Sequence, residues 1–234
     1  MSQTETKTPT QAPFNAPTPE VLDTRARILR AASRIFVQKG FDGASLRTIT
    51  QAADVNLAAV NYHFGSKDKL VWEVLRERIE PLNLQRLGLL DEAVARADGG
   101  PVPVEEIVDA FMAPVAESMR EQMEDDEPIL IALVTRMYTE SSDFFQELFK
   151  TFFKELSERF IAELCRSMPD YPPEEVRQRY MMMVAIMLGV IMHHAKCAEV
   201  NNSGFPKEPV KTIMQRMRMF ILSGLSQPLQ VETS

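Results

Sequence analysis

The chain has 234 residues, of which 45% are hydrophobic and 25% are charged, and a net charge of −7. With nine glycines, fifteen prolines and two cysteines, it is not a collagen-like, low-complexity or disulfide-scaffold protein, and its composition is typical of a globular one. The longest apolar stretch, Met181–Met192, is shorter than the roughly 20 apolar residues that a membrane-spanning helix needs. The N-terminus lacks the apolar run of a secretory signal, so we expect a cytoplasmic protein without membrane contact.

The overall acidity argues against nucleic-acid binding at first sight, but the charge is unevenly distributed. Residues 22–72 contain eight lysines and arginines against four aspartates, which gives this segment a charge of +4 and leaves −11 for the rest. A basic segment joined to an acidic remainder is typical of a DNA-binding module fused to one that does not bind DNA. Ordinary scatter of charges is the alternative.

The first eighteen residues are rich in Thr, Pro and Gln, lack apolar periodicity, and are predicted to form a disordered arm. Pro19, preceded by a capping threonine, predicts the start of a helix, and Gly40 predicts its end. Apolar residues recur between them at helical spacing and predict a buried stripe: Ile28, Ala32, Ile35 and Phe36.

Two short helices, 46–53 and 57–63, are predicted next, because Ser45 and Asn56 are capping residues placed just before them. The turn between these helices begins at Asp54. Two short helices around a tight turn, braced by a preceding helix, indicate a helix-turn-helix.

A longer helix is predicted from Lys67 to about Glu80, where Pro81 is expected to end or kink it. Pro114 is a second expected kink. Loops are expected at 98–103 and 169–173. The remaining predicted helices span 104–123, 128–139, 143–168, 174–200 and 206–225. No segment alternates as a strand does, so the predicted fold class is all-α.

The second short helix of a helix-turn-helix enters the major groove of DNA with one side and packs on its neighbours with the other. Val60 and Phe64 are expected to form the packed side. Asn61 suits a paired hydrogen bond to adenine, and an alanine suits contact with a thymine methyl. The residues expected to contact bases or phosphates are Ser45, Arg47, Thr48, Leu57, Ala58, Ala59, Asn61, Tyr62, His63 and Lys67.

The stretch Ser45–Leu70, SLRTITQAADVNLAAVNYHFGSKDKL, resembles the DNA-binding signature of the TetR/AcrR transcriptional regulators, and Arg27–Phe41 resembles the first helix of that family. Two positions depart from the family pattern. Asp54 stands where the family usually has Gly, and we expect the turn to survive because aspartate tolerates a left-handed backbone. Asn61 stands where the family often has Tyr, and Tyr62 follows one position later. Which of these two residues takes the place of the family's aromatic phosphate contact is left open.

The resemblance implies about nine helices, with a helix-turn-helix head and a body for ligand binding and dimerisation. Members are usually homodimeric repressors that leave a palindromic operator when a small molecule occupies the body. We then expect half-sites about one turn of DNA apart or slightly more, and a lever between head and body near 72–81. The expected domains are a disordered arm at 1–18, the head at 19–72 and the body at 73–228.

Methionines and aromatic residues of the body are candidates for an apolar ligand pocket, with ordinary core packing as the alternative. No cluster of basic residues stands in apolar surroundings, which favours a lipophilic effector over a strongly anionic one. The family resemblance implies an efflux substrate or a fatty-acyl compound as such an effector. The candidate pocket residues are Met112, Met119, Met137, Tyr138, Phe149, Phe152, Phe153 and Met187. The alternative is a regulator without a small-molecule ligand, controlled by protein partners or by thiol state.

The stretch Met181–Met192 is apolar all round, so its helix is expected to be buried on most sides. One interpretation is a dimer interface, formed together with the helix at 206–225. The other is the wall of a pocket, and the two are compatible.

His193 and Cys197 are four residues apart on one predicted helix and could ligate a metal, but no third ligand presents itself, so we expect no metal or cofactor. Cys165 and Cys197 are expected to be free thiols, with a bridge between them as the alternative. The chain has no Gly-rich phosphate loop, no Gly-x-Ser-x-Gly and no His-Glu-x-x-His, so an enzyme is not expected.

Overall fold

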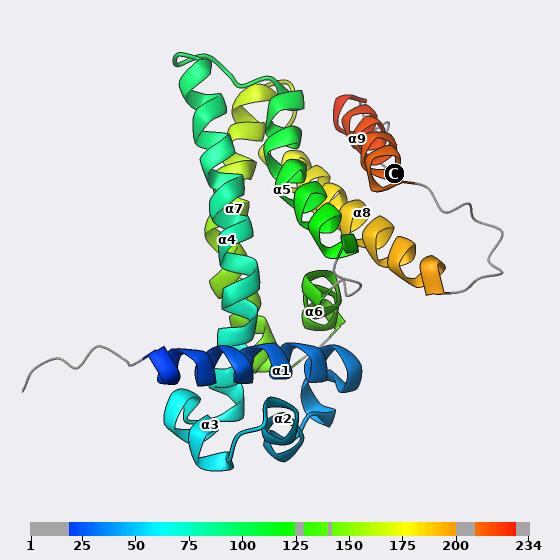
Figure 1. Cartoon of the computed structure of the whole chain (residues 1–234). Helices are drawn as coiled ribbons and strands as arrows, with labels where there is room; N and C mark the ends of the chain where they lie inside the picture. Colours follow the sequence, from blue (N-terminus) through cyan, green and yellow to red (C-terminus); the bar gives the residue numbers. More distant parts are fainter. Residues whose placement is uncertain (1–18, 125–128, 140–141, 200–208, 228–234) are drawn as a thin grey trace, which may run out of the picture.

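The computed structural model describes residues 19–124, 129–139, 142–199 and 209–227, and over these residues the chain forms nine α-helices and no strand (Figure 1). The predicted all-α fold is confirmed, while the predicted arm at 1–18 lies outside the described residues. The helices are α1 (Pro19–Gly43), α2 (Leu46–Ala53), α3 (Leu57–Phe64), α4 (Lys67–Arg96), α5 (Val104–Glu124), α6 (Ile129–Thr139), α7 (Asp143–Ser167), α8 (Pro173–Glu199) and α9 (Val210–Ser226).

We call α1, α2 and α3 the head helices, and special backbone conformations determine their path. Gly40, with φ 76° and ψ 170°, breaks the helical path inside α1 and redirects the chain toward α2. Asp54 ends α2 in the left-handed conformation, with φ 53° and ψ 52°, so the turn forms with aspartate in place of glycine. Ser45 and Asn56 cap α2 and α3 through their side chains, as predicted.

Helix α4 is the longest helix, with 30 residues, and it connects the head to the far end of the body (Figure 1). The prediction that it ends near Pro81 is wrong, because α4 continues to Arg96. Pro81 is exposed, so water can reach the carbonyl group that lacks an amide partner one turn earlier. Buried residues on both sides of the proline, among them Ile79 and Leu90, hold the helix in place through packing.

The head helices share one buried cluster, which we call the head cluster, with the start of α4, with α6 and with the start of α7. Leu133 and Met137 of α6 lie in this cluster, as do Phe145 and Leu148 of α7. The hydrophobic core of the head is therefore completed by two helices that come much later in the sequence.

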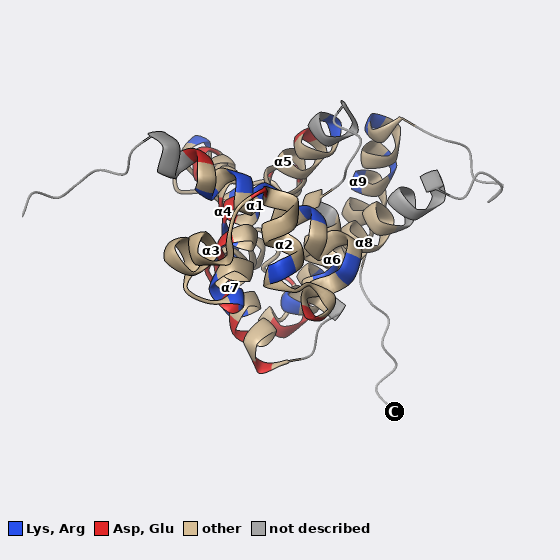
Figure 2. Ribbon diagram, turned by 60° about the horizontal axis from the view of Figure 1, so that its bottom comes forward, with Lys and Arg blue, Asp and Glu red and all other residues tan. Residues whose placement is uncertain are grey.

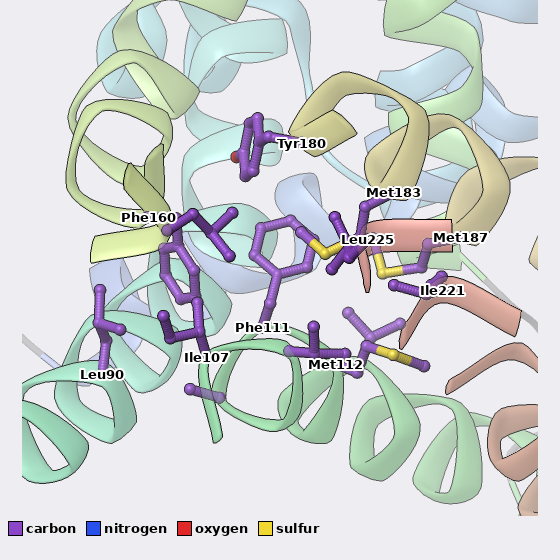
Figure 3. Packing of buried hydrophobic residues seen from close by; sticks show 14 of the residues in the cluster. Leu90, Ile107, Phe111, Met112, Phe160, Tyr180, Met183, Met187, Ile221 and Leu225 are labelled. Carbon is purple, nitrogen blue, oxygen red and sulfur yellow. The ribbon is translucent and has the colours of Figure 1, made fainter. Parts of the chain in front are cut away.

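A second buried cluster, which we call the body cluster, joins α4, α5, α7, α8 and α9. Phe111 of α5 lies at its centre beside Phe160 of α7, and Met183 and Met187 of α8 belong to the same cluster (Figure 3). The ring of Phe111 meets those of Phe160 and Tyr180 edge-on, with centroids 5.1 and 5.8 Å apart. This aromatic packing joins α5, α7 and α8 at the level where α4 runs past them.

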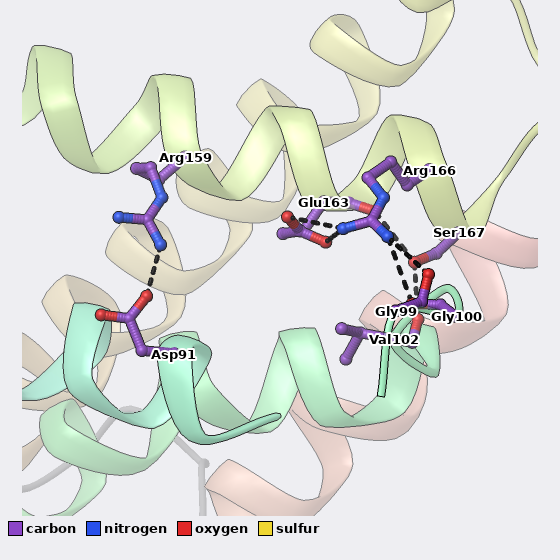
Figure 4. A network of polar contacts seen from close by, with 8 residues as sticks. All are labelled: Asp91, Gly99, Gly100, Val102, Arg159, Glu163, Arg166 and Ser167. Carbon is purple, nitrogen blue, oxygen red and sulfur yellow. Dashed lines mark hydrogen bonds and ion pairs between the residues drawn. The ribbon is translucent and has the colours of Figure 1, made fainter. Parts of the chain in front are cut away.

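The loop between α4 and α5 lies where one was predicted and is held by α7 (Figure 4). Arg166 donates a hydrogen bond to the carbonyl oxygen of Gly99 at 3.2 Å, and Ser167 donates one to that of Val102. These contacts tie the end of the helix pair opposite the head to α7.

Helix α8 does not fulfil the expectation that it is buried on most sides. Met183, Met187 and Ile191 are buried, but Met181 and Met182 are more than half exposed. The reason is that α6, α7 and α9 pack against α8 and leave another of its faces uncovered in the single chain. Among the described residues, no helix combines the length and apolarity needed to cross a membrane.

Candidate DNA interface and effector cavity

Helix α3 has one buried side and one free side, as predicted. Val60 and Phe64 are buried in the head cluster, whereas Ala58 and Asn61 are exposed and Tyr62 is 79% exposed. The helix carries no charged Lys, Arg, Asp or Glu, so it is uniformly tan in Figure 2. Its free side is therefore neutral and suited to approach base edges, which present both donors and acceptors.

The other candidate DNA residues lie around α3. Ser45, Arg47 and Leu57 are exposed, and Thr48, Ala59, His63 and Lys67 are half-buried. Ala59 also packs against the head cluster, so only part of it is free. The Lys67 ammonium donates a hydrogen bond to the carbonyl oxygen of Asp42 at 3.3 Å, which places this cation beside the end of α1.

Arg27 of α1 holds the turn of the helix-turn-helix. Its Nη2 donates hydrogen bonds of 2.8 Å to the carbonyl oxygens of Ala53 and Asp54, and the same atom lies 3.2 Å from the Asp54 carboxylate. These carbonyls belong to the unpaired C-terminal end of α2, where a cation is favourable. Arg27 is therefore committed to positioning the turn.

The ring of His63 lies beside that of Tyr62 on α3, and the two rings meet edge-on with their centroids 5.2 Å apart. Burial lowers the pKa of His63 below its ordinary value, and the positive charge of Arg25 lowers it further. His63 is therefore neutral at physiological pH and can donate one N–H to a phosphate.

A cavity of about 90 Å³ lies in the body between α4, α5, α6, α7 and α8. Four of the predicted pocket residues line it, namely Tyr138, Phe149, Phe153 and Met187. The other four do not. Met112 lines a separate groove between α5 and α9, Met119 lies in the body cluster, and Met137 lies in the head cluster. Phe152 stacks instead on Trp72 of α4, with centroids 6.4 Å apart.

Sequence reasoning missed the polar lining of the cavity, which comes from Arg86, Ser157 and Tyr180. The expected absence of a basic cluster drew attention away from single basic residues, and Arg86, which is only 3% exposed, is one of them. The available signal was helical spacing, because Arg86 falls on the same face as the apolar Ile79 and Leu90. Because the predicted helix ended at about Glu80, Arg86 lay outside it and its helical spacing was not considered.

Of the metal and thiol candidates, only Cys165 has a side chain within the part of the chain that the structure describes. No group of three or more His, Cys, Asp or Glu suited to a metal ion occurs among the described residues. Cys165 is half-buried and free. The side chains of His193 and Cys197 lie outside the described residues.

Comparison with known proteins assigns both parts of the chain. Residues 28–74 match the model of the bacterial regulatory proteins of the tetR family, and residues 109–224 match that of the tetracyclin repressor-like C-terminal domain. The chain is 33% identical over 106 residues to the HTH-type transcriptional regulator AcrR of Shigella flexneri, covering 43% of this chain and 46% of AcrR. It is 39% identical over 59 residues to the probable HTH-type transcriptional regulator YttP of Bacillus subtilis, covering 25% and 28%.

Solved structures agree over nearly the whole fold. A putative transcriptional regulator from Pseudomonas aeruginosa PAO1 is 18% identical with a TM-score of 0.61, over 86% of this chain and 89% of that chain. The TetR family regulator PfmR from Thermus thermophilus is 20% identical with a TM-score of 0.52, over 86% and 100%. The sequence match to these curated relatives covers less than half of their length, whereas the structural match to the solved structures covers 86% of this chain. The chain belongs to the TetR family of helix-turn-helix, DNA-binding transcriptional regulators, a family of non-enzymes.

Proposed function

We propose that this regulator is a cytoplasmic homodimeric repressor that binds a palindromic operator and leaves it when a small molecule occupies the body. The observation that supports DNA reading most strongly is the two-sided character of α3, with Val60 and Phe64 buried and its opposite side free. The helix is short and is held by capped neighbours, which is the form that fits the major groove.

In the proposed complex, Ala58, Ala59 and Asn61 face base edges, and Asn61 supplies the hydrogen bonds that select a base. Ser45, Thr48, Tyr62, His63 and Lys67 contact phosphates, Leu57 lies at the groove wall, and Arg47 reaches either a phosphate or a guanine. The neutral free side of α3 and the cationic groups around it support this division between base reading and phosphate binding.

The proposed dimer interface is the exposed apolar surface of α8 and α9. Met219 and Phe220 of α9 are each 67% exposed, and Met182 of α8 is 52% exposed. The two helices pack against each other. Large exposed apolar side chains on neighbouring helices are typical of an interaction surface, and a second copy of the chain would bring two heads to one palindrome.

Helices α4 and α6 are the proposed connection between the cavity and the head. Ile79 of α4 lies in the head cluster and also lines the cavity. Leu130 of α6 does the same. A ligand that fits better when these helices have shifted would favour the state that does not bind DNA, as release from the operator requires. The apolar cavity also favours small-molecule control over control by protein partners or thiol state.

Selection from a random DNA duplex pool at fixed, near-physiological salt tests the proposal. We expect enrichment of a palindrome with half-sites about one helical turn apart. The selection is repeated after the protein has been denatured and refolded, which removes any bound effector. If the protein regains its helical fold after refolding and still enriches no palindrome, the proposal is contradicted.

A further inference from the structure

We propose that the cavity binds a small apolar monocarboxylate, an acid with an aromatic or short aliphatic body, whose carboxylate pairs with Arg86. This inference names the ligand class for the effector cavity of the proposed function and rests on that function. It is carried by a buried cation that has no anionic partner among the described residues.

Arg86 is a guanidinium enclosed in the body, and its partners among the described residues are all uncharged, including the Phe111 ring, whose centroid lies 4.0 Å from its Cζ. Its Nε donates a hydrogen bond of 2.9 Å to the carbonyl oxygen of Phe111. Nη1 lies 3.4 Å from the Asn83 side-chain oxygen, and Nη2 lies 3.7 Å from the sulfur of Met187. A thioether sulfur is a weak acceptor, and a guanidinium has five N–H groups to satisfy. No acidic side chain of the described residues pairs with it.

A second buried arginine shows what complete pairing looks like in this protein. Arg179 is also 3% exposed, but its Nε donates to the Glu175 carboxylate at 2.8 Å. Its two terminal nitrogens donate to carbonyl oxygens at the end of α9, including that of Gln227 at 2.7 Å. The charge of Arg179 is thus neutralised by a carboxylate, whereas Arg86 has no carboxylate partner among the described residues.

The surroundings of Arg86 suit a carboxylate at one point and an apolar body elsewhere. Burial lowers the pKa of Arg86 to about 10, so it remains a cation at neutral pH. Burial raises the pKa of Tyr138 to about 12, so its hydroxyl stays a hydrogen-bond donor. The hydroxyl groups of Ser157 and Tyr180 lie 3.1 Å apart at the same wall. A carboxylate can accept from the guanidinium and from such hydroxyls together.

The rest of the lining is apolar and aromatic, including Phe149, Phe153 and Val184, and Arg86 is its only charged residue among those the structure describes. A cavity needs about 10–15 Å³ to hold one water, so the 90 Å³ of this cavity leave room for several non-hydrogen atoms. A second charge would have no partner in such a lining and would be costly to bury. These features favour a small acid with a single charge.

Calorimetric titration of the refolded full chain at pH 7.5 with three acids, benzoate, phenylacetate and hexanoate, tests the inference. Each acid is compared with its neutral amide, which has nearly the same shape. We expect at least one acid to bind at least about 10-fold more tightly than its amide, because a buried charge pair forms only with the acid. If no acid binds more tightly than its amide, the proposal is overturned.

Variants then assign the preference to Arg86. In Arg86→Met the acid should lose its advantage over the amide, while thermal stability should be unchanged or higher because an unpaired buried charge is removed. Arg86→Gln serves the same purpose if the methionine variant does not fold. The matched control is Arg159→Met, which removes a half-exposed surface cation and should keep the preference. An acid preference that persists in Arg86→Met or in Arg86→Gln would overturn the assignment.

These titrations contain no DNA, so they are independent of the operator selection. Acid binding through Arg86 without an enriched palindrome would support the ligand class and contradict the regulator proposal. An enriched palindrome without acid binding would support the regulator proposal and overturn the ligand class.

Discussion

Arg136 of α6 donates two hydrogen bonds to the carbonyl oxygen of Val37 in α1, from Nη2 at 2.7 Å and from Nε at 3.1 Å. The acceptor lies in the last helical turn before Gly40, where the carbonyl groups lack helical partners. On the same helix, Val134 and Tyr138 line the cavity. A single helix therefore lines the cavity with one face and is hydrogen-bonded to the first head helix through another.

Replacing Arg136 should loosen this contact between α6 and the head. Arg136→Met removes the donors to Val37 and keeps an apolar stem, so we expect a loss of about 1–3 kcal/mol in the free energy of unfolding, measured by urea denaturation. Arg120→Met is the matched control, because Arg120 is exposed and pairs with Glu117 on its own helix. The control should cost at most about 0.5 kcal/mol. Equal losses in the two variants would contradict the bridging role.

Lys67→Ala should weaken binding to every DNA sequence by a similar factor. The lysine is proposed to neutralise one phosphate, and each such contact contributes about 0.9 to the slope of log affinity against log salt concentration. Affinities measured at several salt concentrations on operator and random duplexes check this prediction. An unchanged salt slope would show that Lys67 makes no phosphate contact.

Asn61→Ala should act differently, by relaxing the preference at one base pair of each half-site. A good paired contact to a base discriminates by about 1–3 kcal/mol, whereas binding to random DNA should change little. Repeating the duplex selection with the variant shows which position loses information. A uniform loss across all sequences would assign Asn61 to the DNA backbone instead.

The affinity for the operator should rise as the pH falls from about 7.5 to about 5.5. In the free protein the pKa of His63 lies below its ordinary value of 6.5, and a phosphate beside the ring would raise it, so binding takes up a proton. Protein stability should respond with the opposite sign. The unfolded chain holds the His63 proton more tightly, so the contribution of His63 to stability is lost as the pH falls below 6.5.

The variant His63→Asn isolates this effect, since both other histidines, His193 and His194, remain in place. Its operator affinity should depend less on pH than that of the unmodified chain, as measured by fluorescence anisotropy at constant ionic strength. Identical pH profiles for the two proteins would exclude His63 as a phosphate contact.

Phe220→Lys should convert the proposed dimer to a monomer, because it places a charge in the middle of the apolar surface of α8 and α9. Sedimentation equilibrium measures the change, and we expect the dissociation constant to rise by a factor of about 100 or more. The control is Leu84→Lys, which changes another exposed apolar residue, on α4. Dissociation caused equally by the control would point to a different interface.

The sequence by itself determined the helix-turn-helix almost residue by residue. Caps at Ser45 and Asn56, a left-handed turn at Asp54 and apolar spacing at Val60 and Phe64 all act within a few residues along the chain. Such local rules can be read without knowing the rest of the fold. The same holds for the loops flanking the body helices, where proline and glycine restrict the backbone directly.

The tertiary structure alone decided where the cavity lies and which groups line it. Arg86 and Tyr180 are 94 positions apart in the sequence, and they share one wall because α4 and α8 both face the same space. Pro81 would end many helices, yet packing of buried residues on both sides carries α4 through it. A binding site made by several helices depends on how those helices pack together, and the period of any one helix reveals only which of its faces is buried.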